Sequence, residues 1–381
     1  MTYSVFRSTL LLMALACAVS GEEVKFAIES NHLLVIGPDG VVYGQGRNDY
    51  GQSIGDDPRQ WSTRFRPVIG APKASSVRVY GFSSMVLGID GRVYVWGRHT
   101  HSLLGGDGRN MQLVTRAPTP VPGLDRVRAI AACQYGGAAV RDDGTLWMWG
   151  EDKYGVMGTG YMTGPYESGK AYHQPKKVEG LENVSHIECG SEHMVALKTD
   201  GTVWAWGHNK FGQLGLGDTE PRSRPTQLPE LKGVTRIRAG GALSAARLAD
   251  GSWRLWGKAG PVGEGKDEYF KPALKPAALP THLRSTVDFE EILFLLKDGS
   301  VWVWGDNSFG TLGTGGDTGD FSVKGVPVRP LAGIVQVWAN GNRCLAMKDD
   351  GSLYMWGPGL GRNNFRKPTL IGKYPEILSA P

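Results

Sequence analysis

The segment GHNKFGQLGLGD, residues 207–218, has the composition of a phosphate-binding loop. Glycine-rich loops bind phosphate because their main-chain N–H groups can approach the anion closely. Such a loop occurs once in a chain, whereas similar glycine runs stand here at 47–55, 151–160, 208–217 and 306–315, and there is no Walker sequence. The recurrence predicts that the glycine run is scaffold and binds no cofactor.

Other side chains with chemical capacity lack the partners that the chemistry needs. His99 and His101 form half of a metal site, without a nearby carboxylate or third histidine. The segment TGGDTGD, 314–320, resembles a calcium loop but lacks tandem repetition. His32 and His193 occupy equivalent positions of a repeated segment, and we expect each to bond local backbone in a turn. With no Gly-x-Ser-x-Gly sequence either, we predict no enzyme, no metal and no cofactor.

A longer pattern surrounds these groups and recurs about every 52 residues. It consists of Asp-Gly, an apolar pair and, in most copies, Trp-Gly. The seven copies are DGVVYGQG (39–46), DGRVYVWG (90–97), DGTLWMWG (143–150), DGTVWAWG (200–207), DGSWRLWG (250–257), DGSVWVWG (298–305) and DGSLYMWG (350–357).

One repeat, residues 184–229, contains four segments typical of strands. VSHIEC alternates apolar and polar residues, HMVALK and TVWAW flank an Asp-Gly hairpin turn, and PTQL follows the glycine run. The third strands are apolar on both faces, as in LWMW (146–149), which suits a sheet packed between two neighbours. Seven such units predict an all-β fold, a seven-bladed β-propeller with four-stranded antiparallel blades.

The recurring DGxVWxWGxNxxGQLGxG resembles the RCC1 repeat (regulator of chromosome condensation), and the resemblance covers 24–373. It implies the same seven-bladed propeller. Three units depart from the pattern. The fifth has KAGPVGEG (258–265) in place of the glycine run, the second has RHTHSLLGGDG (98–108), and the first has Gln45 where tryptophan is usual. We expect the ring to close by pairing of the C-terminal PTLI (368–371) with N-terminal strands that begin with VKFAI (24–28), because closure protects sheet edges.

The first residues have the layout of a secretory signal. Arg7 precedes an apolar run over 10–19, which is too short to span a membrane as a helix. Two processing routes stay open: a cut after Ser20, or lipidation of Cys17 in ALAC, which resembles a bacterial lipoprotein box imperfectly. We predict a signal peptide over 1–20 and one propeller domain over 21–381. The expected location is periplasmic, outer-membrane-anchored or secreted.

The remaining cysteines are Cys133, Cys189 and Cys344, and they form no zinc-spaced cluster. Cys133 (IAACQ) and Cys189 (IECGS) stand at equivalent positions of neighbouring repeats. Each is a small buried hydrophobe at a strand end, or the two lie within disulfide range. The spacing leaves both interpretations open.

Long and variable segments of the chain fall at one place in the repeat. In an up-and-down blade, the first turn and the third-to-fourth loop emerge on one face, and the Asp-Gly turns emerge on the other. The segments 56–66, 107–116, 159–174, 266–271 and 316–324 are third-to-fourth loops rich in aromatic residues and arginine, which are typical of binding hot spots. We predict a partner-binding face comprising Trp61, Arg64, Phe65, Arg66, Tyr161, Tyr166, Tyr172, Tyr269, Phe270 and Phe321. The alternative is that these aromatic side chains fold back and cap the propeller.

These observations favour a bacterial, exported, monomeric propeller that binds a protein partner or another surface ligand through this face, as an inhibitor or adaptor. The net charge of +5 arises from 42 basic and 37 acidic residues that are interspersed, so we expect no nucleic-acid partner and membrane contact only through a lipid on Cys17. The resemblance implies alternatives: nucleotide exchange on a small GTPase, as for the founding family member, or a host-directed effector. An enzyme on a propeller frame is the third class.

Overall fold

The computed structural model describes residues 26–29, 31–98, 114–164, 169–258, 270–277, 282–287, 291–296, 298–307, 309–316, 321–329, 331–340, 343–358 and 364–374. This part of the chain contains strands β1 to β28 and turns. The strands form seven separate four-stranded antiparallel sheets, each built from four consecutive strands. The sequence prediction of a seven-bladed propeller is therefore confirmed.

The blades follow one another in chain order, and the strand bounds are as follows. Blades 1 and 2 contain β1 Phe26–Glu29, β2 His32–Ile36, β3 Val42–Arg47, β4 Trp61–Pro67, β5 Ala74–Tyr80, β6 Ser83–Gly88, β7 Val93–Arg98 and β8 Val114–Pro120. Blades 3 and 4 contain β9 Val127–Cys133, β10 Gly136–Arg141, β11 Leu146–Asp152, β12 Lys170–Lys177, β13 Val184–Cys189, β14 His193–Lys198, β15 Val203–Gly207 and β16 Arg222–Gln227. Blades 5 to 7 contain β17 Val234–Gly240, β18 Leu243–Leu248, β19 Trp253–Gly257, β20 Phe270–Ala277, β21 His282–Val287, β22 Glu291–Leu296, β23 Val301–Asp306, β24 Phe321–Pro327, β25 Ile334–Asn340, β26 Arg343–Lys348, β27 Ser352–Pro358 and β28 Asn364–Lys373.

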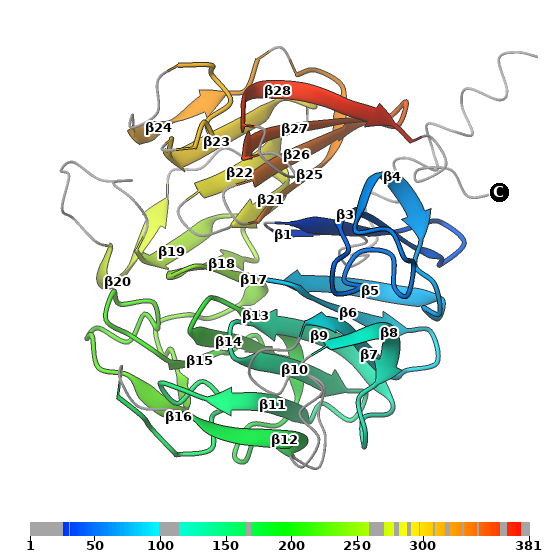
Figure 1. The fold of residues 1–381 in the computed structure, drawn as a ribbon. Helices are drawn as coiled ribbons and strands as arrows, with labels where there is room; N and C mark the ends of the chain where they lie inside the picture. The colour runs from blue at the N-terminus through cyan, green and yellow to red at the C-terminus, as the bar shows by residue number, and fades with distance from the viewer. Residues whose placement is uncertain are drawn as a thin grey trace, which may run out of the picture.

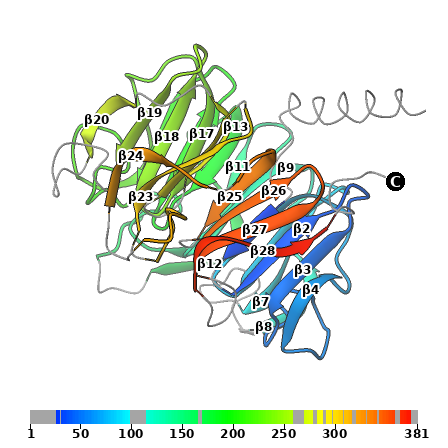
Figure 2. The ribbon, with the colours of Figure 1, turned by 90° about the horizontal axis from the view of Figure 1, so that it is seen from above.

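The first strand of each blade lies at the centre of the ring. The inner strands contact one another in the order β1, β5, β9, β13, β17, β21, β25 and back to β1, as Figure 1 shows. The fourth strands, such as β4, β16 and β28, lie at the periphery in Figure 1, and Figure 2 shows β4 and β20 on opposite sides of the molecule. No helix in the described part of the chain is long and apolar enough to cross a membrane.

The Asp-Gly pairs make the hairpin turns between second and third strands, as predicted. In blade 4, Gly201 has a φ of +80°, which a residue with a Cβ rarely adopts. The Asp200 carboxylate accepts hydrogen bonds from the main-chain N–H of Thr202 at 3.0 Å and from its hydroxyl group at 2.6 Å. The residues of the turn thereby satisfy one another's hydrogen-bonding groups, so the turn does not need a longer loop.

In four blades, the tryptophan of the third strand is anchored on the glycine run of the preceding blade. Trp206 is fully buried, as predicted, and its indole N–H donates to the Val156 carbonyl oxygen at 2.8 Å. The same bond joins Trp96 to Gln52, Trp256 to Gln213 and Trp356 to Thr311. A Cβ on Gly215 would lie 2.8 Å from the Trp256 ring, so glycine makes room for the indole. The glycine run is scaffold, as its recurrence predicts. The side chain of Trp304, for which we expect the same burial, lies outside the described residues.

His32 and His193 also bridge neighbouring blades, which corrects the expectation of a bond to local backbone. Each imidazole Nε2 lies 2.7–2.8 Å from the hydroxyl group of a serine in the next blade, Ser84 and Ser244 respectively. The Ser244 hydroxyl in turn donates to the Gln213 carbonyl oxygen at 2.9 Å. Burial lowers the pKa of both histidines from 6.5 to about 3, so they are neutral at physiological pH.

The ring does not close by strand pairing, and this part of the fold prediction is wrong. Strand β28, which contains PTLI, pairs with β27 in its own blade, and β1 pairs with β2. The first repeat already supplies all four strands of blade 1, so no position is left for a C-terminal strand. Closure depends on side-chain packing instead: the Phe26 ring stacks on Trp338 at 4.5 Å between centroids, and Phe65 packs against Tyr374 at 4.7 Å.

Candidate partner-binding face

One face of the ring carries the first turn of each blade together with its third-to-fourth loop. A residue at the end of the third strand bonds the first turn at this edge. His208 N–H donates to the Glu192 carbonyl oxygen at 2.9 Å, and Arg98 N–H donates to that of Phe82 at 3.0 Å. We call this the loop face. The Asp-Gly turns lie at the opposite ends of the same strands.

The glycine runs place aromatic side chains on the loop face. Each of the four runs has an aromatic residue directly before its glycine, and these residues are Tyr50, Tyr154, Phe211 and Phe309. Tyr50, Tyr154 and Phe211 are half-buried, whereas Phe309 is 45% exposed. The sequence interpretation treated the runs as scaffold and missed these side chains. The recurrence of tyrosine or phenylalanine at this one position is the signal that could have found them.

A polar and aromatic cluster spans blades 3 and 4 on this face. Tyr135 Oη donates to Glu192 Oε1 at 3.2 Å, and His208 Nδ1 lies 3.0 Å from Glu192 Oε2. The imidazole of His208 lies 4.7 Å from the Tyr154 ring. The Lys153 ammonium lies over the rings of both Tyr135 and Tyr154, at 5.7 and 5.5 Å from their centroids. Two first turns and two glycine loops therefore meet at this junction.

The protonation states of the cluster follow from burial and from these bonds. Burial, followed by the charge of Glu192, raises the pKa of Tyr135 well above its ordinary value, so the phenol stays protonated and donates. Burial also raises the pKa of Glu192, but the interactions with His208, Tyr135 and Lys153 together outweigh it and lower that pKa overall. Glu192 is accordingly a carboxylate near neutral pH.

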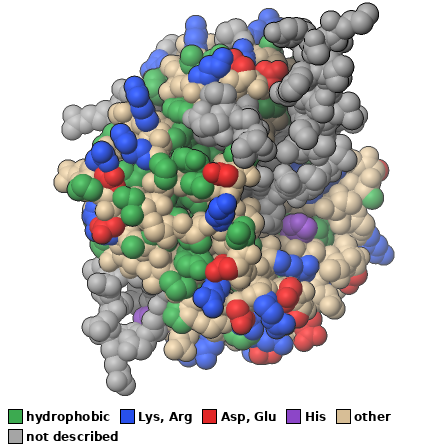
Figure 3. Space-filling model, turned by 90° about the vertical axis from the view of Figure 1, so that its right-hand side faces the viewer, with side chains coloured by type: hydrophobic (Ala, Val, Ile, Leu, Met, Phe, Trp, Pro, Cys, Tyr) green, Lys and Arg blue, Asp and Glu red, His purple; other side chains and the backbone are tan. Residues whose placement is uncertain are grey.

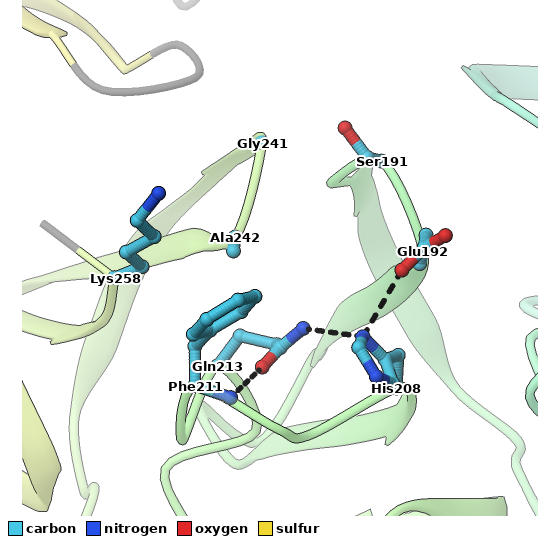
Figure 4. A pocket seen from close by; sticks show the side chains of 8 residues that line it. All are labelled: Ser191, Glu192, His208, Phe211, Gln213, Gly241, Ala242 and Lys258. Carbon is cyan, nitrogen blue, oxygen red and sulfur yellow. Dashed lines mark hydrogen bonds and ion pairs between the residues drawn. The ribbon is translucent and has the colours of Figure 1, made fainter. Parts of the chain in front are cut away.

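A shallow pocket of about 190 Å³ lies beside this cluster, between blades 4 and 5 (Figure 4). Figure 4 shows Lys258 and Phe211 on one side and Glu192 with His208 on the other, linked through Gln213. The Lys258 ammonium lies 5.5 Å from the centroid of the Phe211 ring. The remaining lining residues are Ser191, Gly241 and Ala242. The buried hydroxyl group of Ser191 has no hydrogen-bond partner among the described residues.

The predicted face residues of blade 1 lie on a strand rather than in a loop. Trp61, Arg64, Phe65 and Arg66 belong to β4, the outer strand. Trp61 is 37% exposed, and both arginines are exposed. Phe65 is half-buried against Phe26 and Tyr374, so it contributes to ring closure.

Of the other predicted face residues, one is exposed, one is held by a hydrogen bond, and the side chains of the rest lie outside the described residues. Tyr161 is 42% exposed in the loop after β11, and the Tyr172 hydroxyl group, on β12, donates to Thr159 Oγ1 at 3.3 Å. Phe270 and Phe321 begin the outer strands β20 and β24, and their side chains lie outside the described residues. Tyr166, Tyr269, His99, His101 and Cys17 also lie outside them, as do 317–320 of the calcium-like segment. No group of three His, Cys, Asp or Glu residues that could hold a metal ion occurs in the described ranges.

The fold and this face define a class, that of seven-bladed propellers with a short-turn face and a loop face. Comparison with known families identifies the family within the class. The sequence model of the RCC1-like domain matches residues 13–292, and that of the RCC1 repeat matches residues 292–311. The chain belongs to the RCC1 family, as its repeats indicate.

Relatives in sequence are RCC1-domain proteins of several kinds. The chain is 31% identical over 292 residues to the human E3 ubiquitin-protein ligase HERC2, covering 71% of this chain and 6% of that protein. It is 29% identical over 293 residues to the mitochondrial RCC1 domain-containing protein RUG3 of Arabidopsis thaliana, covering 73% and 64%. It is 26% identical over 298 residues to the ultraviolet-B receptor UVR8 of the same plant, covering 76% and 66%. The chain thus spans less than two thirds of each relative's length.

Solved structures show the same fold. Yeast RCC1 (Prp20), in a crystal structure with Kap60, matches with a TM-score of 0.73 at 20% identity, covering 87% of this chain and 84% of that one. Human WBSCR16 also has a TM-score of 0.73, at 18% identity, covering 87% and 93%.

Proposed function

We propose that this chain is an exported, non-enzymatic propeller that binds a protein partner through its loop face. One observation carries the proposal. Among the described aromatic side chains, the three that are most exposed are Trp61, Tyr161 and Phe309, and each lies on a segment that follows a third strand. The three belong to different blades and share the loop face, and exposed aromatic side chains are typical of binding hot spots.

The polar groups of the loop face support the same proposal. Lys153 and Arg98 contact tyrosine rings and make no ion pair among the described residues, so their charges remain available to a partner. The unpaired Ser191 hydroxyl group lies in the pocket lining, where a group from a partner can satisfy it.

The charge pattern of the surface also favours a protein partner. On the side of the molecule shown in Figure 3, acidic and basic side chains are interspersed, an arrangement that favours a protein over a nucleic acid.

A family precedent also supports a protein partner. Prp20p of Saccharomyces cerevisiae, a propeller with binding properties to Gsp1p and histones, matches this chain with a TM-score of 0.69 at 21% identity. If the loop face of this chain binds a protein, the chain uses its propeller as a protein-binding surface, as Prp20p does. Export, with either a cut after Ser20 or a lipid on Cys17, remains supported by the apolar run over 10–19. It would separate this chain from intracellular GTPases.

Photo-crosslinking from defined positions tests the proposal. A photoreactive phenylalanine analogue replaces Tyr161 or Phe309 on the loop face, and, as the matched control, Ile89, which is 69% exposed in an Asp-Gly turn. We expect irradiation in the native host to give the same discrete protein adduct from positions 161 and 309 and none from 89.

An adduct that forms only from position 89 would place the partner on the opposite face and overturn the proposal. An adduct with a small GTPase from the loop face would favour the exchange-factor alternative over a scaffold in the cell envelope. Mass spectrometry of the adduct distinguishes these results.

A further inference from the structure

Cys133 and Cys189 meet at the junction of blades 3 and 4. Each is the last residue of the innermost strand of its blade, β9 and β13 respectively, and these two strands contact each other. Both side chains belong to one apolar cluster, Cys133 buried in it and Cys189 packed against it half-buried. The interaction with Cys189 lowers the pKa of the Cys133 thiol, and burial, followed by the interaction with Cys133, raises that of the Cys189 thiol. The Cys133 thiol also donates to the Gly136 carbonyl oxygen at 3.4 Å, and Cys189 Sγ lies 3.2 Å from Met194 Sδ. All three described cysteines are free thiols in this structure.

We propose that Cys133 and Cys189 form a disulfide bond that joins blade 3 to blade 4. Bridged cysteines need closely approaching Cβ atoms, and these two residues stand at equivalent ends of two contacting strands. The bond would close a chain segment that contains β10 to β12 of blade 3 and the first strand of blade 4, β13. Cross-links of this kind stabilise a fold by restricting its unfolded state.

The oxidation proceeds by thiol–disulfide exchange with a small disulfide such as glutathione disulfide. One cysteine thiolate attacks a glutathione sulfur, forms a mixed disulfide and releases one glutathione. The second thiolate then attacks the protein sulfur of the mixed disulfide and releases the second glutathione. The two thiol protons end on the two glutathione molecules, and the protein loses two electrons to the reagent.

The bond would also fix part of the loop face. Tyr135 and Glu192, whose side chains are hydrogen-bonded at 3.2 Å, lie in the turns that directly follow Cys133 and Cys189. A covalent link between the two strand ends holds these turns together. The oxidised protein therefore presents the blade 3–4 junction as one rigid surface.

Cys344 is a built-in control. It lies on β26 of blade 7, fully buried, and its thiol contacts the Thr311 carbonyl oxygen at 3.8 Å. Blade 7 is adjacent to blades 6 and 1 in the ring, so Cys344 is remote from the other pair. Trypsin separates the three cysteines into the peptides 129–141, 178–198 and 344–348.

The experiment is peptide mapping of the full chain after incubation with glutathione disulfide under native conditions and alkylation of the remaining thiols. We expect 129–141 cross-linked to 178–198, alkylated 344–348, and a melting temperature at least about 2 °C above that of the reduced protein. Cys189→Ser should abolish both the cross-link and the shift. Three alkylated thiols in folded, oxidant-treated protein, or a cross-link through Cys344, would overturn the pairing.

The same map of protein from the native host separates this inference from the proposed export. A cross-link in the host supports both the pairing and an oxidising compartment. A cross-link that forms in glutathione disulfide but is absent in the host supports the pairing and contradicts the export.

Discussion

The indole N–H of Trp206 donates a 2.8 Å hydrogen bond to the main-chain carbonyl oxygen of Val156 in the neighbouring blade. The bond connects the two most regular parts of the repeat, the third-strand Trp-Gly and the glycine run. The third strand supplies a large apolar side chain with a single donor. The glycine run supplies a buried main-chain carbonyl group and the space left by missing Cβ atoms. The spacing of the repeat is thereby tied to contacts between blades.

Removal of this tryptophan tests that role. Trp206→Ala leaves a cavity and an unpaired buried carbonyl group, so we expect the free energy of unfolding to fall by about 3–5 kcal/mol. Denaturant titration measures it. Trp61→Ala, at a 37% exposed position, is the control and should cost less than about 1 kcal/mol. Equal losses in the two variants would contradict the packing described here.

Ring closure by side-chain packing gives a second prediction. Phe26 is 1% exposed and stacks on Trp338, which joins the innermost strands of the first and last blades. Phe26→Ala should lower the free energy of unfolding by about 3–5 kcal/mol, as other large aromatic deletions do. Removal of 364–381, which contains β28, should also lower the melting temperature because blade 7 loses its outer strand. Unchanged unfolding in both variants would show that closure contributes nothing to stability.

The buried histidines give the protein a pH dependence of known sign. The folded state holds His32 and His193 neutral with a pKa of about 3, against 6.5 for the unfolded chain. Between these values the unfolded state binds more protons, so stability that is complete above pH 6.5 is lost as the pH falls toward 3. We expect a loss on the order of 2 kcal/mol per histidine between pH 7 and pH 5.

A histidine-free variant isolates this effect. His32→Gln combined with His193→Gln lowers stability at pH 8 but should flatten the slope of unfolding free energy against pH between 5 and 7. Chemical denaturation at several pH values measures the slope. The same slope in the wild type and in the variant would mean that other groups govern acid unfolding.

Export gives a prediction at the N-terminus. Because the apolar run over 10–19 ends in small residues, protein isolated from the native host should lack at least residues 1–16. N-terminal sequencing or intact mass measures this. If Cys17 carries a lipid, Cys17→Ser should release the protein from membranes, whereas a cut after Ser20 predicts no change. Intact Met1 on the isolated protein would contradict export by either route.

The sequence predicted what the repeat encodes and failed where repeats interact. Asp200-Gly201 and Trp206 could be placed because turn chemistry and strand periodicity are local properties. The mode of ring closure could not be predicted, because the segment PTLI fits the outer strand of any blade. It is excluded from the sheet of blade 1 only because the first repeat already supplies all four strands of that sheet. The bond from His193 to Ser244 was missed for the same reason, since it joins residues of different blades. In the sequence, Phe65 and Trp61 are two aromatic residues of the same variable segment, and nothing local separates their roles. The packing of Tyr374 against Phe65 makes Phe65 a closure residue, whereas Trp61 stays exposed.

The central claim is that the loop face binds the partner. A binding titration of this chain against the partner protein that photo-crosslinking identifies tests the claim most directly. Trp61→Ala, Tyr154→Ala, Tyr161→Ala and Phe309→Ala are compared with Ile89→Ala on the opposite face. We predict that one or two of the four lose at least about 2 kcal/mol of binding free energy, roughly 30-fold in Kd, while Ile89→Ala stays within about 0.5 kcal/mol of the wild type. Loss of binding in Ile89→Ala with wild-type affinity in all four aromatic variants would contradict the claim.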